Sequence, residues 1–103
     1  MEKFIPLGSI VLLNDGVKKL MIIARAITIK NGDEEFYFDY GAVFYPEGLI
    51  GDELAYFNKD DIAKVVAEGY VDSDEEQMIN NIDIYLSKLS GVKKGNVKDW
   101  KEQ

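Results

Sequence analysis

The chain has 103 residues, 47% of them hydrophobic, which is enough for one domain with its own core. It contains no cysteine and no histidine, so disulfides, thiolate nucleophiles, Ser-His-Asp triads and histidine-ligated metals are excluded. The net charge of −7 disfavours nucleic acid and anionic membranes as partners, because both bind through clustered Lys and Arg. Its apolar runs are far shorter than the roughly 20 residues of a membrane helix, and its start lacks a signal-peptide pattern. We therefore expect a cytoplasmic protein.

The first part of the sequence predicts two strands joined by a tight turn, with a second turn after them. Residues 8–13 form a short β-branched run, and residues 18–29 carry apolar side chains on both alternating faces, as a central strand does. Asn14-Asp15-Gly16 and Asn31-Gly32-Asp33 contain residues that tolerate the left-handed backbone of hairpin turns. Antiparallel hairpins are therefore expected at both places.

Residues 35–45 predict the next strand, because their side chains alternate with a period of two. The face expected to be buried consists of the even positions, Phe36, Phe38, Tyr40, Ala42 and Phe44. Pro46 fixes its own φ angle and has no N–H to donate, so the strand should end before it. A further strand is expected at residues 54–57.

Residues 58–69 allow two interpretations. Local rules describe a capped helix with Ile62, Val65 and Val66 on one side and Gly69 at its end. The same stretch also fits a short helical turn at residues 59–63 followed by a strand at 64–70, which would let a barrel close. Periodicity does not decide between them in so short a segment.

Residues 73–89 predict the clearest helix. Ser73 and Glu76 match the S-x-x-E capping box, and acidic residues fill the first turn, where they favour the helix dipole. An apolar stripe follows at helical spacing, formed by Met78, Ile79, Ile82, Tyr85, Leu86 and Leu89. We expect the stripe to pack on the sheet, because an exposed one would promote aggregation.

These elements predict a single α+β domain over residues 1–91, followed by a loosely ordered basic tail over residues 92–103. The domain would be a small, strongly bent antiparallel sheet of about five strands, of the SH3-like barrel kind, with one C-terminal amphipathic helix.

No catalytic, cofactor or metal site is predicted. Asp52-Glu53 and Asp60-Asp61 are the only acidic cluster near a glycine-containing loop, and adjacent acids usually point in different directions into solvent. A carboxylate-dependent enzyme is therefore the least favoured alternative. A stand-alone regulatory module that binds a small ligand is another, and it would need a large apolar pocket.

Several motifs occur in an order that resembles the domain of unknown function 4176 family. They are Ile5-Pro6-Leu7-Gly8-Ser9, Lys19-Leu20-Met21-Ile22-Ile23, Tyr45-Pro46-Glu47-Gly48 with Gly51-Asp52-Glu53, and Phe57-Asn58-x-x-Asp61-Ile62. The resemblance covers about residues 5–90. It implies a small protein of Gram-positive bacteria, encoded near type VII secretion systems and their LXG toxins, with an accessory or chaperone-like role and no established catalytic residues.

The function expected is thus a non-enzymatic protein-interaction module whose partner is an LXG-type toxin or another secretion component. The surface expected to bind this partner has an apolar centre for burial and an acidic rim for steering. It comprises Tyr45, Glu47, Leu49, Ile50, Asp52, Glu53 and Tyr56.

Overall fold

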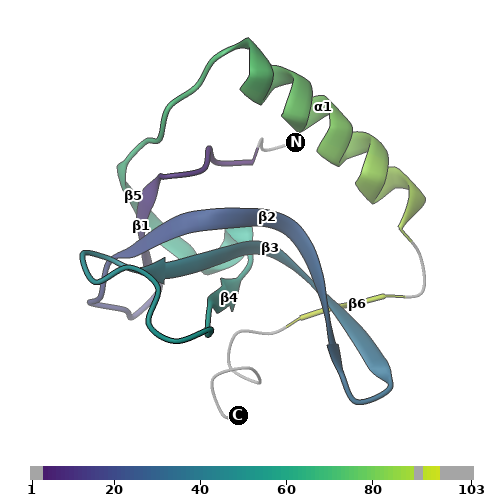
Figure 1. Ribbon diagram of the computed structural model, residues 1–103, viewed down its shortest axis with the longest axis horizontal. Helices are drawn as coiled ribbons and strands as arrows, with labels where there is room; N and C mark the ends of the chain where they lie inside the picture. Colours follow the sequence, from purple (N-terminus) through teal and green to yellow (C-terminus); the bar gives the residue numbers. More distant parts are fainter. Residues whose placement is uncertain (1–3, 90–91, 96–103) are drawn as a thin grey trace.

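The computed structural model describes residues 4–89 and 92–95 of the chain. Its elements follow the order β1 (Ile10–Leu13), β2 (Leu20–Asn31), β3 (Glu34–Phe44), β4 (Ala55–Phe57), the 3-10 turn η1 (Lys59–Asp61), β5 (Ile62–Ala67), α1 (Ser73–Lys88) and β6 (Lys93–Lys94). Figure 1 shows a strongly bent sheet with α1 crossing above it, and the N-terminal segment lies between the two. The predicted α+β architecture is therefore confirmed.

The sheet has the strand order β4-β3-β2-β1-β5, and these five strands pair antiparallel. Both predicted hairpins are present, with Asp15 at φ 62° in the first turn and Gly32 at φ 69° in the second. The long β2–β3 hairpin curves over its whole length (Figure 1). Within the described residues no ladder joins the edge strands β4 and β5, so the sheet is open rather than a closed barrel.

Residues 58–69 form a turn followed by a strand, not a helix. The Asp61 carboxylate accepts a hydrogen bond from the Asn58 backbone N–H at 2.8 Å, which stabilises the single turn η1. The chain then enters β5, which pairs with the outer edge of β1. The second of the two sequence interpretations is therefore confirmed, because the free edge of β1 supplies backbone partners that local propensity does not reveal.

Strand β3 is buried on both faces over most of its length. Phe38, Tyr40 and Ala42 are buried as predicted, but Tyr37, Asp39, Gly41 and Val43 on the other parity are buried too. The prediction is wrong for Phe44, which is exposed at the end of the strand, where the chain turns into the following loop. β3 lies inside the sheet, between β2 on one side and β4 and β6 on the other, so its backbone has hydrogen-bond partners on both edges.

Helix α1 begins one residue earlier than the capping-box motif suggests. Asp72 is the N-cap, and its carboxylate accepts a hydrogen bond from the Glu75 N–H at 3.2 Å, so the predicted Ser73–Glu76 box is wrong. Aspartate and serine are about equally good N-caps, so the motif alone could not choose between neighbours. Within the described residues, no helix is both long and apolar enough to cross a bilayer.

The packed face of α1 is narrower than the predicted stripe. Ile82 is buried in the main core with Phe4, Val11, Leu20, Ile22, Tyr40, Ala42 and Phe57, and Ile79 and Leu86 pack against the margin of this core. Met78 and Tyr85 remain largely exposed. The predicted docking of the helix on the sheet is confirmed, with Ile82 as its centre.

A buried polar cluster fixes the outer edge of β3. The Asp39 carboxylate accepts hydrogen bonds from the Tyr37 hydroxyl at 2.9 Å and from the Lys59 N–H at 2.8 Å. Asn58 accepts from the Asp39 N–H at 3.0 Å and donates to the Gly95 carbonyl at 2.9 Å. Burial, reinforced by the adjacent carboxylate, raises the pKa of the Tyr37 hydroxyl far above its usual range. The cluster is satisfied internally, and we interpret it as structural.

Strand β6 pairs parallel with β3 at Phe36 and Tyr37, and Gly95 donates a backbone hydrogen bond to the Tyr37 carbonyl at 2.7 Å. These residues belong to the segment 92–103 that the sequence assigns to a loosely ordered tail. Residues 96–103 lie outside the described residues, so the division into a domain over 1–91 and a tail stays a prediction.

Candidate functional site

The loop over residues 45–54 leaves the sheet where β3 ends and turns back on itself. The Gly48 N–H donates to the Phe44 carbonyl at 2.7 Å, closing the first turn. Gly48 and Gly51 have φ angles of 82° and 66°, in the left-handed region that favours glycine. The two glycines therefore let the short segment between them project from the sheet.

That segment presents two consecutive aliphatic side chains to solvent. Leu49 is 56% exposed and Ile50 is 60% exposed. Exposure alone does not define a site, since Val17 and Tyr70 are still more exposed. Leu49 and Ile50 combine their exposure with a position between the two loop glycines and just before the exposed acids Asp52 and Glu53. The predicted combination of apolar centre and acidic rim is thus present in the exposed part of the loop.

The two tyrosines of the predicted surface have different surroundings. Tyr45 is exposed, and its backbone N–H donates to the Lys19 carbonyl at 3.0 Å, so its position relative to β2 is fixed. Tyr56 lies in β4, half-buried, with its ring centroid 5.6 Å from that of Phe38. Tyr45 can therefore contact a partner directly, whereas Tyr56 mainly supports the strand behind the loop.

Glu47 differs from the other acids of the surface because it already has a cationic partner. Its two carboxylate oxygens lie 2.5 and 2.6 Å from the Lys18 ammonium nitrogen. The hydrogen bond from Lys18 lowers the pKa of the Glu47 carboxyl, and the backbone contributes in the same direction. Asp52 and Glu53 have no such ion pair within the described residues, so they carry the available negative charge of this surface.

The carboxylates considered for an enzyme have other surroundings. Asp61 accepts the hydrogen bond that closes η1, and the neighbouring Asp60 carbonyl accepts one from the Asn14 amide at 3.0 Å. Neither they nor Asp52 and Glu53 line the groove described next. In the part of the chain that the structure describes, no three acidic side chains gather as a metal site would require.

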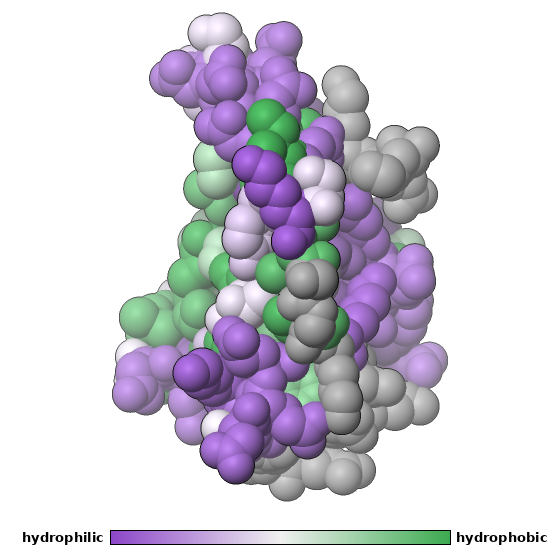
Figure 2. Space-filling view, turned by 90° about the vertical axis from the view of Figure 1, so that its right-hand side faces the viewer, coloured by the Kyte–Doolittle hydropathy of each residue, from purple (hydrophilic) through white to green (hydrophobic). Residues whose placement is uncertain are grey.

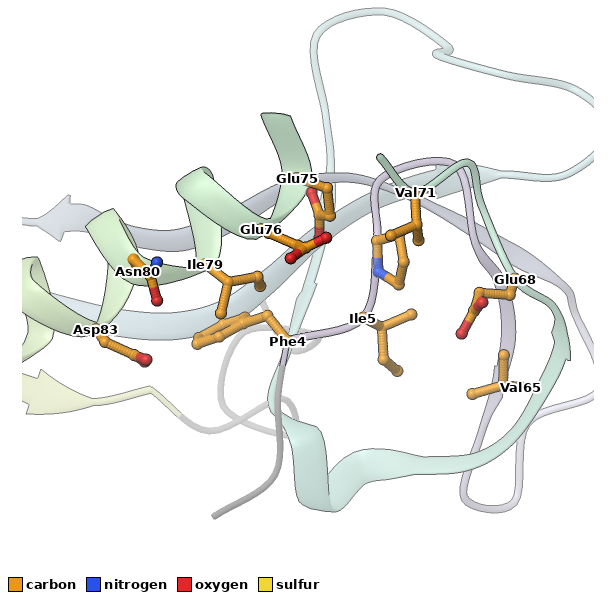
Figure 3. Close-up of a pocket in the computed structure, with 11 residues that line it drawn as sticks. Phe4, Ile5, Val65, Glu68, Val71, Glu75, Glu76, Ile79, Asn80 and Asp83 are labelled. Atoms are coloured by element: carbon orange, nitrogen blue, oxygen red, sulfur yellow. The ribbon is translucent and has the colours of Figure 1, made fainter. Parts of the chain in front are cut away.

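A groove of about 740 Å³ lies on another part of the molecule. It is bounded by the N-terminal segment, by β5 and the residues that follow it, and by the part of α1 from Glu75 to Asp83 (Figure 3). Its apolar lining consists of Phe4, Ile5, Pro6, Val65, Val71 and Ile79. Sequence patterns do not predict this groove, because its walls come from three segments far apart in the chain.

The groove also has acidic walls. Glu68, Glu75, Glu76 and Asp83 line it, together with Asn80. The Glu75 carboxylate forms a two-point ion pair with the Arg25 guanidinium, one contact of which measures 2.8 Å, and both side chains are largely buried. Glu68, Glu76 and Asp83 form no ion pair with any described residue. Three uncompensated carboxylates therefore surround the apolar lining.

Figure 2 shows one further side of the molecule, which bears the C-terminal half of α1 and the end of the β2–β3 hairpin. Hydrophilic residues cover its upper and lower ends, and hydrophobic side chains are exposed in a band between them (Figure 2). Exposed hydrophobic side chains thus occur on several faces of the molecule. At the loop and at the groove they lie beside acidic residues, so these two places are the more specific candidates for a binding site.

Within the described residues, the bent open sheet, the single covering helix and these two surfaces define a small α+β domain. The family model described as "Domain of unknown function (DUF4176)" matches residues 4–78. The chain belongs to this family. It matches no curated protein and no solved structure.

Proposed function

We propose that the protein is a non-enzymatic interaction module that acts in the cytoplasm as an accessory or chaperone-like factor for a type VII secretion toxin. The observation that supports this proposal is the exposed pair Leu49 and Ile50, set between two loop glycines and followed by Asp52 and Glu53. The resemblance to proteins encoded near LXG toxins supplies the kind of partner.

The loop supplies the centre of the interface. Full burial of a Leu or Ile side chain contributes roughly 1.5–3 kcal/mol, so completing the burial of two half-exposed ones gives about 2–3 kcal/mol. Association itself costs more than this, and a stable interface buries about 800 Å² on each partner. Tyr45 and the neighbouring surface therefore join the contact, while Leu49 and Ile50 form its anchor.

The acids next to the anchor select a basic partner. Asp52 and Glu53 are exposed and lack an ion pair within the described residues, so they attract Lys and Arg side chains as the complex forms. Glu47 contributes less, because Lys18 already neutralises it. A basic amphipathic helix of the toxin, with aliphatic residues on one face, satisfies both requirements.

Co-purification tests the proposal. The tagged protein is expressed together with the products of the genes that neighbour its own, and bound proteins are identified after washing. The Leu49→Asp, Ile50→Asp double variant should lose the partner, whereas Val17→Asp, which changes a fully solvated side chain outside the loop, should retain it.

Circular dichroism must first show that both variants are folded. If the folded wild-type protein retains no neighbouring product, the chaperone role is contradicted. If the double variant retains the partner as well as the wild type, the partner is real and the loop is not its binding site.

A further inference from the structure

The groove between the N-terminal segment and α1 combines an apolar lining with an excess of acidic side chains. Its lining includes Phe4, Ile5 and Val71, while Glu68, Glu76 and Asp83 stand around it without a cationic partner among the described residues. Two cations contact residues of this region. Arg25 is engaged by Glu75 and by the Ile5 carbonyl, and the Lys59 ammonium nitrogen lies 4.1 Å from the centroid of the Phe4 ring. The groove therefore offers apolar burial and an unbalanced negative charge in one place.

Three polar residues of α1, two of them acidic, are arranged in a row along the groove. Glu76, Asn80 and Asp83 follow one another at spacings of four and three residues, so they lie on one face of the helix and span about 10 Å along its axis. Figure 3 shows all three side chains on the helix that forms one wall of the groove. A second helix lying alongside would place cationic side chains opposite this row with the same periodicity.

We propose that the groove is a second docking site, which binds a basic amphipathic helix of a partner protein. Aliphatic side chains of that helix enter the apolar part of the groove, and its Lys or Arg residues pair with Glu76, Asp83 and Glu68. The volume of about 740 Å³ accommodates a few side chains of such a helix rather than the whole helix, which remains at the surface. The site is separate from the loop that carries Leu49 and Ile50, and it does not depend on the function proposed for that loop.

Fluorescence anisotropy with synthetic peptides tests this site directly. The probe is a labelled peptide of about 15 residues, long enough to form a helix, with Leu at positions i, i+3, i+4 and i+7 and Lys on the other face. One comparison peptide has the same composition in scrambled order, and another replaces every Lys by Glu. We expect the wild-type protein to bind the first peptide, to bind the other two much more weakly, and to lose affinity as salt increases.

Matched variants locate the contact. Glu76→Gln with Asp83→Asn should weaken binding about tenfold, since two charge pairs of moderate strength are lost. Asp33→Asn with Glu35→Gln removes the same charge from the exposed β2–β3 hairpin and should change the affinity little. Val71→Ser should weaken binding and Val17→Ser should not, because only Val71 lines the groove.

The Leu49→Asp, Ile50→Asp variant should bind the peptide as the wild type does. The experiment therefore tests the groove separately from the function proposed for the loop. The proposal is overturned if the wild-type protein does not bind the Lys peptide, if the scrambled peptide binds equally, or if the hairpin variant loses as much affinity as the groove variant. Binding of a small apolar dye in the groove, with no binding of the peptide, would also overturn it and would indicate a ligand-binding module.

Discussion

Replacing Ile82 by alanine measures how strongly α1 is attached to the sheet. Ile82 is 3% exposed and belongs to the main core, and the substitution removes three carbon atoms from that core. Truncations of this kind cost about 2–5 kcal/mol, depending on how far the surroundings relax. Because the helix is covered on one side only, we expect Ile82→Ala to lower the free energy of unfolding by about 3 kcal/mol. This is a large part of the roughly 5–15 kcal/mol that stabilises a small domain.

Ile84 provides a matched control in the same helix. The replacement of Ile by Ala changes the helix propensity by the same few tenths of a kcal/mol at both positions. Because Ile84 is 54% exposed, Ile84→Ala removes little buried apolar surface. Urea unfolding followed by circular dichroism gives both free energies of unfolding. With slopes of about 1–3 kcal/mol per molar, Ile82→Ala should lower the midpoint by about 1–3 M, and Ile84→Ala should leave it nearly unchanged. Equal midpoints for the two variants would refute the docking of α1 through Ile82.

Three other substitutions test separate parts of the structure. A methyl group at Gly69 would lie 2.0 Å from a backbone carbonyl oxygen, so Gly69→Ala should lower the free energy of unfolding by more than about 2 kcal/mol; a wild-type melting temperature would contradict that close approach. Glu75→Gln leaves the charge of the nearly buried Arg25 unpaired and should cost about 3 kcal/mol in the same measurement, whereas a loss below about 1 kcal/mol would mean that the pair is solvated. Because hydrogen bonding to Lys18 lowers the pKa of Glu47, the ion pair is complete above the ordinary pKa of glutamate and is lost as the pH falls through the lowered value. NMR titration should show the Glu47 pKa rising in Lys18→Met, and an identical titration curve in both proteins would exclude the pair in solution.

Local sequence signals were sufficient for the parts of the fold that depend on local chemistry. The turns at residues 14–16 and 31–33, the end of β3 before Pro46 and the amphipathic helix all follow from neighbouring residues. The exposure of Leu49 and Ile50 also agrees with the sequence, since the flanking glycines and acids mark a surface loop. Their role in binding stays a prediction.

Features that depend on long-range contacts could not be predicted in the same way. Strand β5 forms because β1 has a free edge, and Asp39 is buried because Lys59 and Tyr37 supply its hydrogen bonds. The groove is built from residues that are up to 79 positions apart, from Phe4 to Asp83. A periodic pattern indicates which face of a helix or strand is apolar, but it does not indicate which distant segment of the chain will cover that face.

The central claim is that the loop over residues 45–54 contacts the secretion partner, and hydrogen exchange of the complex tests it most directly. Backbone amides of an exposed loop exchange rapidly, and burial in an interface slows them. We expect slower exchange in residues 47–53 when the captured partner is bound, with the tip of the β2–β3 hairpin at residues 31–34 unchanged as an internal control. Unchanged exchange in residues 47–53 of a saturated complex would contradict the claim.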